Sequence, residues 1–205
     1  MNTKYFDIVF LQPQKFKKKI KKIDIQSGEC IDNLVGHTNV IRSVSINFDN
    51  TKIVSGSDDK TVRIWDFNTC ECIHILRGHT QYISSVCFSP DGSKIVSGSY
   101  DSTVKIWNSE TYELLNTLIG HTEGVTSVSF SSDNTKIVSG SFDKTVRIWD
   151  SFTGECVRTL LDNKDLITSV SFSPDGSRIM SLSLDDEIIL WDSITYECIH
   201  NLECN

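Results

Sequence analysis

Serine, histidine and aspartate recur together in this chain, and these residue types form the catalytic triad of many hydrolases. Three histidines are each followed at the same distance along the chain by an aspartate: the pairs are His37 and Asp59, His79 and Asp101, and His121 and Asp143. An enzyme needs one such site, whereas a structural repeat needs the same set in every copy. The irregular region, residues 1–35, offers no histidine, no serine-centred turn and no glycine loop. We therefore predict that the chain is not an enzyme.

The triad-like sets belong to a longer pattern that repeats at a constant interval along the chain. Tryptophan recurs at this interval without an insertion, at Trp65, Trp107, Trp149 and Trp191. Aspartate recurs in step with it, at Asp59, Asp101, Asp143 and Asp185. A fixed period between about 20 and 50 residues is the signature of a repeat architecture, so the period decides the fold before any single element does.

Within each repeat the pattern predicts short strands. Runs rich in Val, Ile, Ser and Thr end in clusters of turn-forming residues. The first run of each repeat closes with an Asp-Asn or Asp-Gly dipeptide, at 49–50, 91–92, 133–134 and 175–176, and such dipeptides favour tight hairpins. Four short antiparallel strands fit in each repeat and leave no room for a helix. The fold class is therefore predicted to be all-β.

Paired motifs identify the repeat more closely. Gly-His stands at 36–37, 78–79 and 120–121, and at constant spacing it is followed by Trp-Asp or Trp-Asn at 65–66, 107–108 and 149–150. Over residues 18–205 the chain resembles the WD-repeat family. The resemblance implies a β-propeller, in which four-stranded antiparallel blades surround a central channel. The expected division is an irregular segment 1–17, a partial blade 18–35, and WD repeats 36–77, 78–119, 120–161 and 162–205.

The resemblance also assigns a structural role to the polar residues. In the first full blade, His37, Asp59, Trp65 and a serine of the second strand would form one buried network, and strand parity allows either Ser55 or Ser57. The matching sets are His79, Asp101 and Trp107, then His121, Asp143 and Trp149, then Asp185 and Trp191. The fourth repeat has Asp162-Asn163 in place of Gly-His and Leu182 in place of a glycine. We expect its network to be incomplete and the blade to be the least stable.

The number of blades is unusual. Residues 18–35 align with the last two strands of a repeat, with Ile23 at the tryptophan position, which brings the total to four full blades and a partial N-terminal one. Three outcomes are open: a strained ring of five blades, an open fan, or an oligomer in which fans complete one another. An open fan would expose apolar faces at both ends. We therefore expect self-association, or a marginally stable fragment, rather than a free monomer.

Charge and cysteine usage narrow the classes of ligand. The formal net charge is −7 although six lysines lie in the Lys15–Lys22 run, so the rest of the chain carries −13 and would repel nucleic acid. The run itself is interpreted as a solvated edge strand, with a nuclear import signal or an anionic-surface patch as alternatives. Cys30, Cys72, Cys156 and Cys198 share one repeat position with Leu114, which indicates packing rather than metal binding. We expect neither a metal nor another cofactor.

The segment that opens the chain is not typical of a signal peptide, and no stretch of 18 apolar residues occurs. These patterns predict no membrane association. We expect a cytoplasmic protein, with the nucleus as the alternative.

Sequence variation among the repeats indicates where a partner would bind. SGSYD and SGSFD differ from SGSDD at one position, which becomes a large aromatic residue. In the family, the residue before the turn aspartate and the start of the first strand lie on the top face. The candidate partner-binding residues there are Arg42, Tyr82, Tyr100 and Phe142, with Asp58, Thr126 and Leu184 beside them. The simpler alternative is that the aromatic residues only cover neighbouring loops.

The function predicted from these features is a non-catalytic scaffold that binds a protein partner through the top face. The alternatives are a substrate-receptor subunit of a ubiquitin ligase or of another multiprotein complex and, more remotely, a nucleic-acid-associated factor.

Overall fold

The computed structural model describes residues 6–7, 19–24 and 30–203, and every element in them is a strand. An N-terminal sheet contains β1 (Phe6–Asp7), β2 (Lys19–Asp24) and β3 (Cys30–Val35). Blade 1 contains β4 (Ile41–Ile46), β5 (Lys52–Ser57), β6 (Val62–Asp66) and β7 (Cys72–Leu76). Blade 2 contains β8 (Ile83–Phe88), β9 (Lys94–Ser99), β10 (Thr103–Asn108) and β11 (Leu114–Ile119).

Blade 3 contains β12 (Val125–Phe130), β13 (Lys136–Ser141), β14 (Val146–Asp150) and β15 (Cys156–Leu160). Blade 4 contains β16 (Ile167–Phe172), β17 (Arg178–Ser183), β18 (Glu187–Asp192) and β19 (Cys198–Glu203). In each blade, successive strands pair antiparallel in chain order. The predicted all-β fold of four-stranded blades with a partial sheet before them is confirmed.

The hairpin turns have the backbone that their sequence demands. The second residue of each Asp-Asn or Asp-Gly dipeptide has a left-handed φ, which is 56° at Asn50, 73° at Gly92, 64° at Asn134 and 72° at Gly176. Glycine and asparagine enter this region at the lowest cost among the common residues. The turns therefore fix the register of the first two strands of each blade.

The second strand of blades 1–3 is buried on both faces. In β5, β9 and β13 the sequence KIVSGS leaves only the lysine partly exposed. A strand covered on both sides cannot alternate between apolar and polar residues, which explains the consecutive Ile and Val. The blades therefore pack face to face, with a core between each pair of neighbours.

Each core combines the last three strands of one blade with the first three of the next. Between blades 1 and 2, Val54, Val62, Ile64 and Leu76 contact Ile83, Val86, Phe88, Ile95 and Trp107. Residues at the same repeat positions build the cores between blades 2 and 3 and between blades 3 and 4. A fully buried Val, Leu or Ile side chain contributes about 1.5–3 kcal/mol. No blade could bury such a face by itself.

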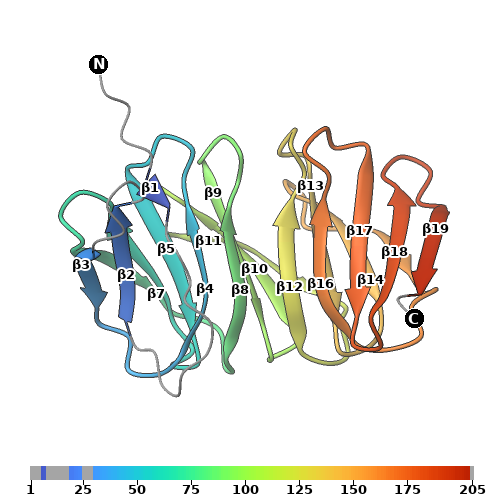
Figure 1. The fold of residues 1–205 in the computed structure, drawn as a ribbon, viewed down its shortest axis with the longest axis horizontal. Coiled ribbons are helices and arrows are strands. Elements are labelled where there is room, and N and C mark those ends of the chain that lie inside the picture. Colours follow the sequence, from blue (N-terminus) through green and yellow to red (C-terminus); the bar gives the residue numbers. More distant parts are fainter. Residues whose placement is uncertain (1–5, 8–18, 25–29, 204–205) are drawn as a thin grey trace.

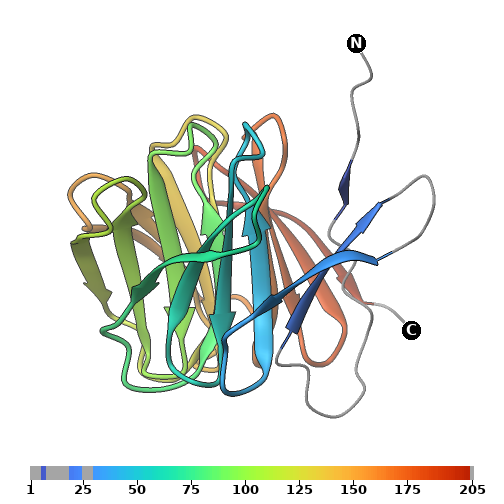
Figure 2. The same cartoon turned by 90° about the vertical axis from the view of Figure 1, so that its left-hand side faces the viewer.

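The sheets stand side by side in an open arc and do not close into a ring (Figures 1 and 2). The N-terminal sheet forms one end, where Ile20 and Leu34 pack against Ile41, Ile53 and Trp65 of blade 1. Blade 4 forms the other end (Figure 1). Of the three outcomes left open by the sequence, the described chain has the open fan.

Two sequence-based expectations about side chains are wrong. Lys22 is not a solvated edge lysine, because it is buried and its Nζ donates a hydrogen bond of 2.7 Å to the carbonyl oxygen of Phe67. The repeated cysteine position is not a core position, because Cys72 and Cys156 are exposed in the outermost strands. Their sulfur atoms each accept a hydrogen bond from an arginine of the adjacent strand. Lys15, Lys17 and Lys18 lie outside the described residues.

A search of the described residues finds no helix with the length and apolar character needed to cross a membrane.

Among the described residues, blade 4 packs against one neighbouring sheet in place of two, and its polar network is smaller than those of the other blades. Its backbone amides should therefore exchange with solvent faster than those of blade 2. The comparison is between residues 166–192 and 82–108 in hydrogen exchange followed by mass spectrometry. Slower exchange in 166–192 would contradict the expected order of stability.

Candidate functional site

A buried polar network in blade 1 joins the loop before β4 to β5, to the turn after β5 and to β6. The His37 ring lies between two partners: Nδ1 is 2.8 Å from Oδ2 of Asp59, and Nε2 is 2.7 Å from Oγ of Ser55. The indole Nε1 of Trp65 donates to the same Ser55 oxygen at 2.8 Å. The structure thus selects Ser55 over Ser57, whose hydroxyl donates to the carbonyl oxygen of Asn39.

The chemistry of these groups determines where the protons lie. An indole N–H can only donate, so the Ser55 oxygen accepts from Trp65 and its own hydroxyl hydrogen is free to donate to His37 Nε2. The ring is then neutral and carries its proton on Nδ1, which donates to Asp59. Every polar atom in this series of hydrogen bonds, from the tryptophan to the aspartate, has a partner. Leaving one of them unpaired would cost about 1–3 kcal/mol.

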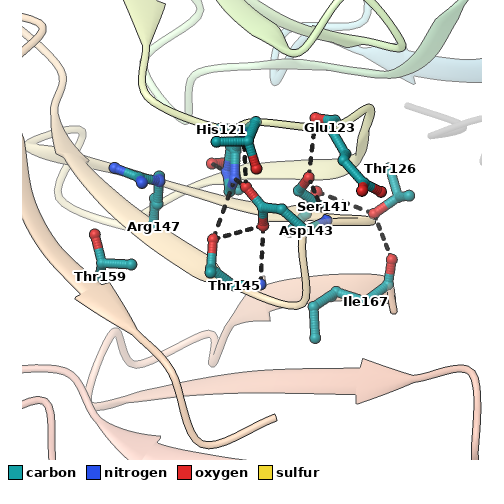
Figure 3. Close-up of polar contacts among 12 residues, drawn as sticks. His121, Glu123, Thr126, Ser141, Asp143, Thr145, Arg147, Thr159 and Ile167 are labelled. Atoms are coloured by element: carbon teal, nitrogen blue, oxygen red, sulfur yellow. Dashed lines mark hydrogen bonds and ion pairs between the residues drawn. The ribbon is translucent and has the colours of Figure 1, made fainter. Parts of the chain in front are cut away.

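Blades 2 and 3 repeat this geometry. His79 lies 2.8 Å from Asp101 and 2.9 Å from Ser97, which accepts from Trp107. In blade 3, Asp143 accepts from Nδ1 of His121 and from the Thr145 hydroxyl, at 2.8 and 2.7 Å (Figure 3). Ser139 joins His121 to Trp149. The structure therefore brings together the residues of each of the three sets.

Each aspartate of the network remains ionised. Burial opposes the charge of Asp101 and Asp143, but hydrogen bonds from histidine and threonine outweigh it and hold the pKa of both carboxyls well below its usual range. The pKa of Asp59 is also lowered, by Thr61, the Thr38 amide and His37 acting against burial. Burial, the largest influence on His37, lowers the pKa of this ring below its ordinary value.

The three serines cannot act as nucleophiles on a substrate. Ser55, Ser97 and Ser139 have no exposed surface, and the three histidines are 4–8% exposed. Each serine oxygen is also occupied by the indole N–H of its blade. These sets resemble a catalytic triad in composition, but a substrate has no access to them.

Blade 4 builds a reduced network from different residues. Asn163 takes the histidine position and accepts a hydrogen bond of 2.9 Å from Ser181, which in turn accepts from Trp191 at 3.2 Å. The side-chain nitrogen of Asn163 is buried and has no hydrogen-bond partner among the described residues. The structure does not bring Asp185 into this network: the residue is exposed, and its carboxylate accepts from Ser183.

Glu187, two residues after Asp185, takes over part of the missing role. Its side chain is 2% exposed and accepts from the backbone amide of Lys164, the residue after Asn163. In blade 1 the corresponding amide, that of Thr38, donates to Asp59. Sequence reasoning missed Glu187 because a glutamate stands where the other repeats have threonine.

The candidate binding residues gather at the end of the blades where the first strands begin. We call this end the upper face. Arg42 and Asp58 form a bidentate ion pair, with both N–O distances at 2.7 Å. The aromatic rings form a row: the Tyr82 and Tyr100 centroids are 6.1 Å apart, and those of Tyr100 and Phe142 are 5.3 Å apart. Tyr82 and Tyr100 remain 40% and 38% exposed.

This row borders an open hollow of about 280 Å³ on the upper face. Its lining residues come from all four blades and are Arg42, Ser84, Tyr100, Thr126, Phe142 and Thr168. Leu184, at the position of Tyr100 and Phe142, is 60% exposed but does not line the hollow, and neither does Asp58, which is buried beside Arg42.

Thr126 has a structural contact as well as a place in the hollow. Its hydroxyl donates to the carbonyl oxygen of Gly140 in its own blade at 3.0 Å and lies 2.7 Å from that of Ile167 in blade 4 (Figure 3). Ser84 makes the equivalent pair of contacts between blades 2 and 3. We name these hydroxyls the blade clamps. Sequence reasoning treated the position only as a binding position, although its recurrence as Ser or Thr in successive repeats was a signal.

Comparison with known proteins agrees with this architecture. Residues 82–199, more than half of the chain, match the family described as the IFT122 first beta-propeller, and residues 28–66 match the WD domain, G-beta repeat. The chain belongs to the WD-repeat β-propeller family. The motifs that carried the resemblance in the sequence are therefore those of the family.

Curated relatives share about one repeat with this WD-repeat chain. A stretch of 44 residues is 54% identical to the Ribosome biogenesis protein BOP1 homolog of Drosophila ananassae and 52% identical to that of Drosophila grimshawi. It covers 20% of the chain and 6% of either relative. The chain thus matches only a small part of these proteins, and the likeness extends to one WD repeat.

Removing a shared serine should destabilise the WD-repeat fold. Ser97→Ala leaves the N–H of Trp107 and Nε2 of His79 without their partner, so the free energy of unfolding should fall by about 1–3 kcal/mol. Chemical denaturation measures the change. Ser132→Ala, at an exposed position, is the control and should leave the stability unchanged. Equal effects of the two substitutions would show that the network does not contribute.

The network also predicts a pH dependence near neutrality. Because the pKa of His37 is lowered in the folded chain, the unfolded chain takes up a proton first, and stability should be lost as the pH falls below about 6.5. His37→Asn, which copies the residue of blade 4, should be less stable at pH 7 and should show a smaller loss between pH 7 and 5. Denaturation at several pH values tests this, and an unchanged slope in the variant would contradict it.

Proposed function

We propose that the chain is a non-catalytic interaction scaffold that binds a protein partner through the upper face. The observation that carries the proposal is the row of Tyr82, Tyr100 and Phe142 beside a hollow lined by all four blades. Aromatic and arginine side chains are the types that dominate the energetics of protein interfaces. Membership of the WD-repeat family agrees with this role at the general level.

The surroundings of the row suit an extended peptide or a loop. The three rings follow one another over neighbouring blades and offer apolar contact that costs little side-chain entropy on binding. Arg42 is held in place by Asp58, while its side chain is still 47% exposed. A rigid cation beside aromatic rings can donate hydrogen bonds to a backbone carbonyl or a carboxylate of the partner. The hollow would then receive one side chain of the bound segment.

Uniformity elsewhere supports the same conclusion. The network residues and blade clamps recur in several blades because every blade must be held alike. The position before the turn aspartate is occupied by Asp58, Tyr100, Phe142 and Leu184. Its residue type therefore varies between repeats, whereas the network and clamp positions vary little. We assign the binding specificity of the chain to this position and to Arg42 and Tyr82.

The proposal predicts separable effects on binding and stability. Panning a phage-displayed peptide library on the immobilised chain supplies a probe, and fluorescence polarisation then measures its affinity for each variant. Tyr100→Ala and Phe142→Ala should each weaken binding about tenfold or more while leaving the fold intact, since truncating an interface anchor costs about 1–2 kcal/mol or more.

Phe48→Ala is the matched control. Phe48 is 71% exposed, and it lies in the turn between β4 and β5, at the opposite end of the blade from the upper face. This variant should bind the probe as the unchanged chain does. If Tyr100→Ala and Phe142→Ala unfold the chain, or if they bind as well as Phe48→Ala does, the aromatic row is packing rather than a binding surface.

A further inference from the structure

Blade 4 has an apolar face that is partly exposed, whereas the same face of blades 1–3 is covered by the following blade. In blades 1–3 four positions face the following blade; in blade 1 these are Val54, Val62, Ile64 and Leu76, all at most 3% exposed. The corresponding residues of blade 4 are Met180, Ile188, Leu190 and Leu202. Met180 is 40% and Leu202 is 51% exposed, and the other two are half-buried. The apolar types are kept although the described chain places nothing over them.

Residues of the types that make polar contacts between blades are also present on this face. The blade clamps Ser84 and Thr126 each contact a carbonyl oxygen of the following blade, whereas Thr168, their counterpart in blade 4, contacts only Leu182 of its own blade within the described residues. Lys94 and Lys136 likewise donate to carbonyl oxygens of the following blade, and Arg178 stands at that position in blade 4, exposed.

One residue on the face indicates what kind of sheet it can accept. A glycine in the second strand of blades 1–3 makes room for the first strand of the following blade; a Cβ on Gly140 would lie 2.4 Å from Cγ2 of Ile167. Blade 4 has Leu182 at this position, so a side chain stands where blades 1–3 leave room for the first strand of the following blade. The partner sheet must therefore leave that space free.

The N-terminal sheet meets this condition. It has three described strands, in the order β1-β2-β3, of which β2 and β3 correspond to the third and fourth strands of a blade. Its inner edge is the short β1 strand, which pairs with β2 through two residues. Within the described residues, no strand stands at the first position of a blade. As far as the described residues go, the place of that strand is open to a side chain as large as leucine.

Charge favours contact between these two ends of the arc. Ile20 and Lys22 of β2 face blade 1, so Lys19 and Lys21, which are exposed, point to the outer face. Residues 1–35 contain seven lysines and four acidic residues, whereas residues 162–205 contain nine acidic and two basic residues. The two segments carry net charges of opposite sign, so blade 4 and the N-terminal sheet of another copy attract.

We propose that the open face of blade 4 binds the outer face of the N-terminal sheet in a second copy of this chain. The contact is head-to-tail, so it joins different surfaces of the two copies and either closes into a ring or continues along a row. It extends the sheet-on-sheet packing of the arc from one copy to the next. This inference stands apart from the upper-face function, because the two surfaces have only Thr168 in common.

Light scattering coupled to size exclusion gives the solution mass of the purified full chain. We expect at least twice the 23.1 kDa of one chain at micromolar concentration. Met180→Glu places a charge in the apolar contact and should return the mass to that of one chain. Ile119→Glu, an equal change at a 78% exposed residue of blade 2, should keep the larger mass. A single-chain mass for the unchanged protein would overturn the proposal.

A second variant acts from the opposite end and does not touch the core. Lys19→Glu combined with Lys21→Glu reverses two exposed charges and should also give a single-chain mass. Mixing it with Met180→Glu should restore a species of two chains, because one intact face remains on each. An assembly that survives the lysine reversal, or a mixture that stays at the single-chain mass, would exclude the head-to-tail contact. The lysine variant decides the question even if Met180→Glu fails to fold.

Discussion

The apolar contact between the face of one blade and the face of the next is the interaction on which the rest of the structure depends. A blade alone is a small twisted sheet with two apolar sides, and neither side can be buried within it. Stacking solves this for every blade that has two neighbours. It also explains why the second strands are apolar on both faces and why glycine recurs opposite Ile83, Val125 and Ile167, where the strands approach most closely.

The polar network and the blade clamps orient the apolar stack. Each network joins the loop before the first strand to the second and third strands, through a serine that serves both the histidine and the tryptophan. Each clamp joins two blades through hydroxyl and carbonyl groups at the upper face. The upper face is therefore a rigid surface, and residues that vary on it, such as Tyr100 and Phe142, are held by a framework that does not vary. Blade 4 departs from this framework, because Asn163 replaces the histidine of its network and Asp185 stays outside it.

The resemblance between the buried sets and a catalytic triad shows how composition can mislead. The same three residue types serve a structural purpose here because the tryptophan indole occupies the serine oxygen and the site is closed to solvent. Spacing alone cannot show burial. Repetition of the same set in three repeats favoured a structural role over a catalytic one. The structure shows the same contact in each blade, with histidine Nε2 at 2.7, 2.9 and 2.8 Å from the serine oxygen.

The sequence by itself determined the period, the strands and the turns and, through the family resemblance, the histidine, aspartate and tryptophan of the three complete networks, because these features recur at a fixed spacing in successive repeats. Tertiary structure alone decided which serine joins the network, that Lys22 is buried, that Glu187 replaces Asp185, and that the repeated cysteines are exposed. It also decided that Thr126 joins two blades and that the arc stays open. These outcomes depend on which face of a strand meets a neighbouring blade. The local sequence pattern does not predict contacts between residues that lie a whole repeat apart.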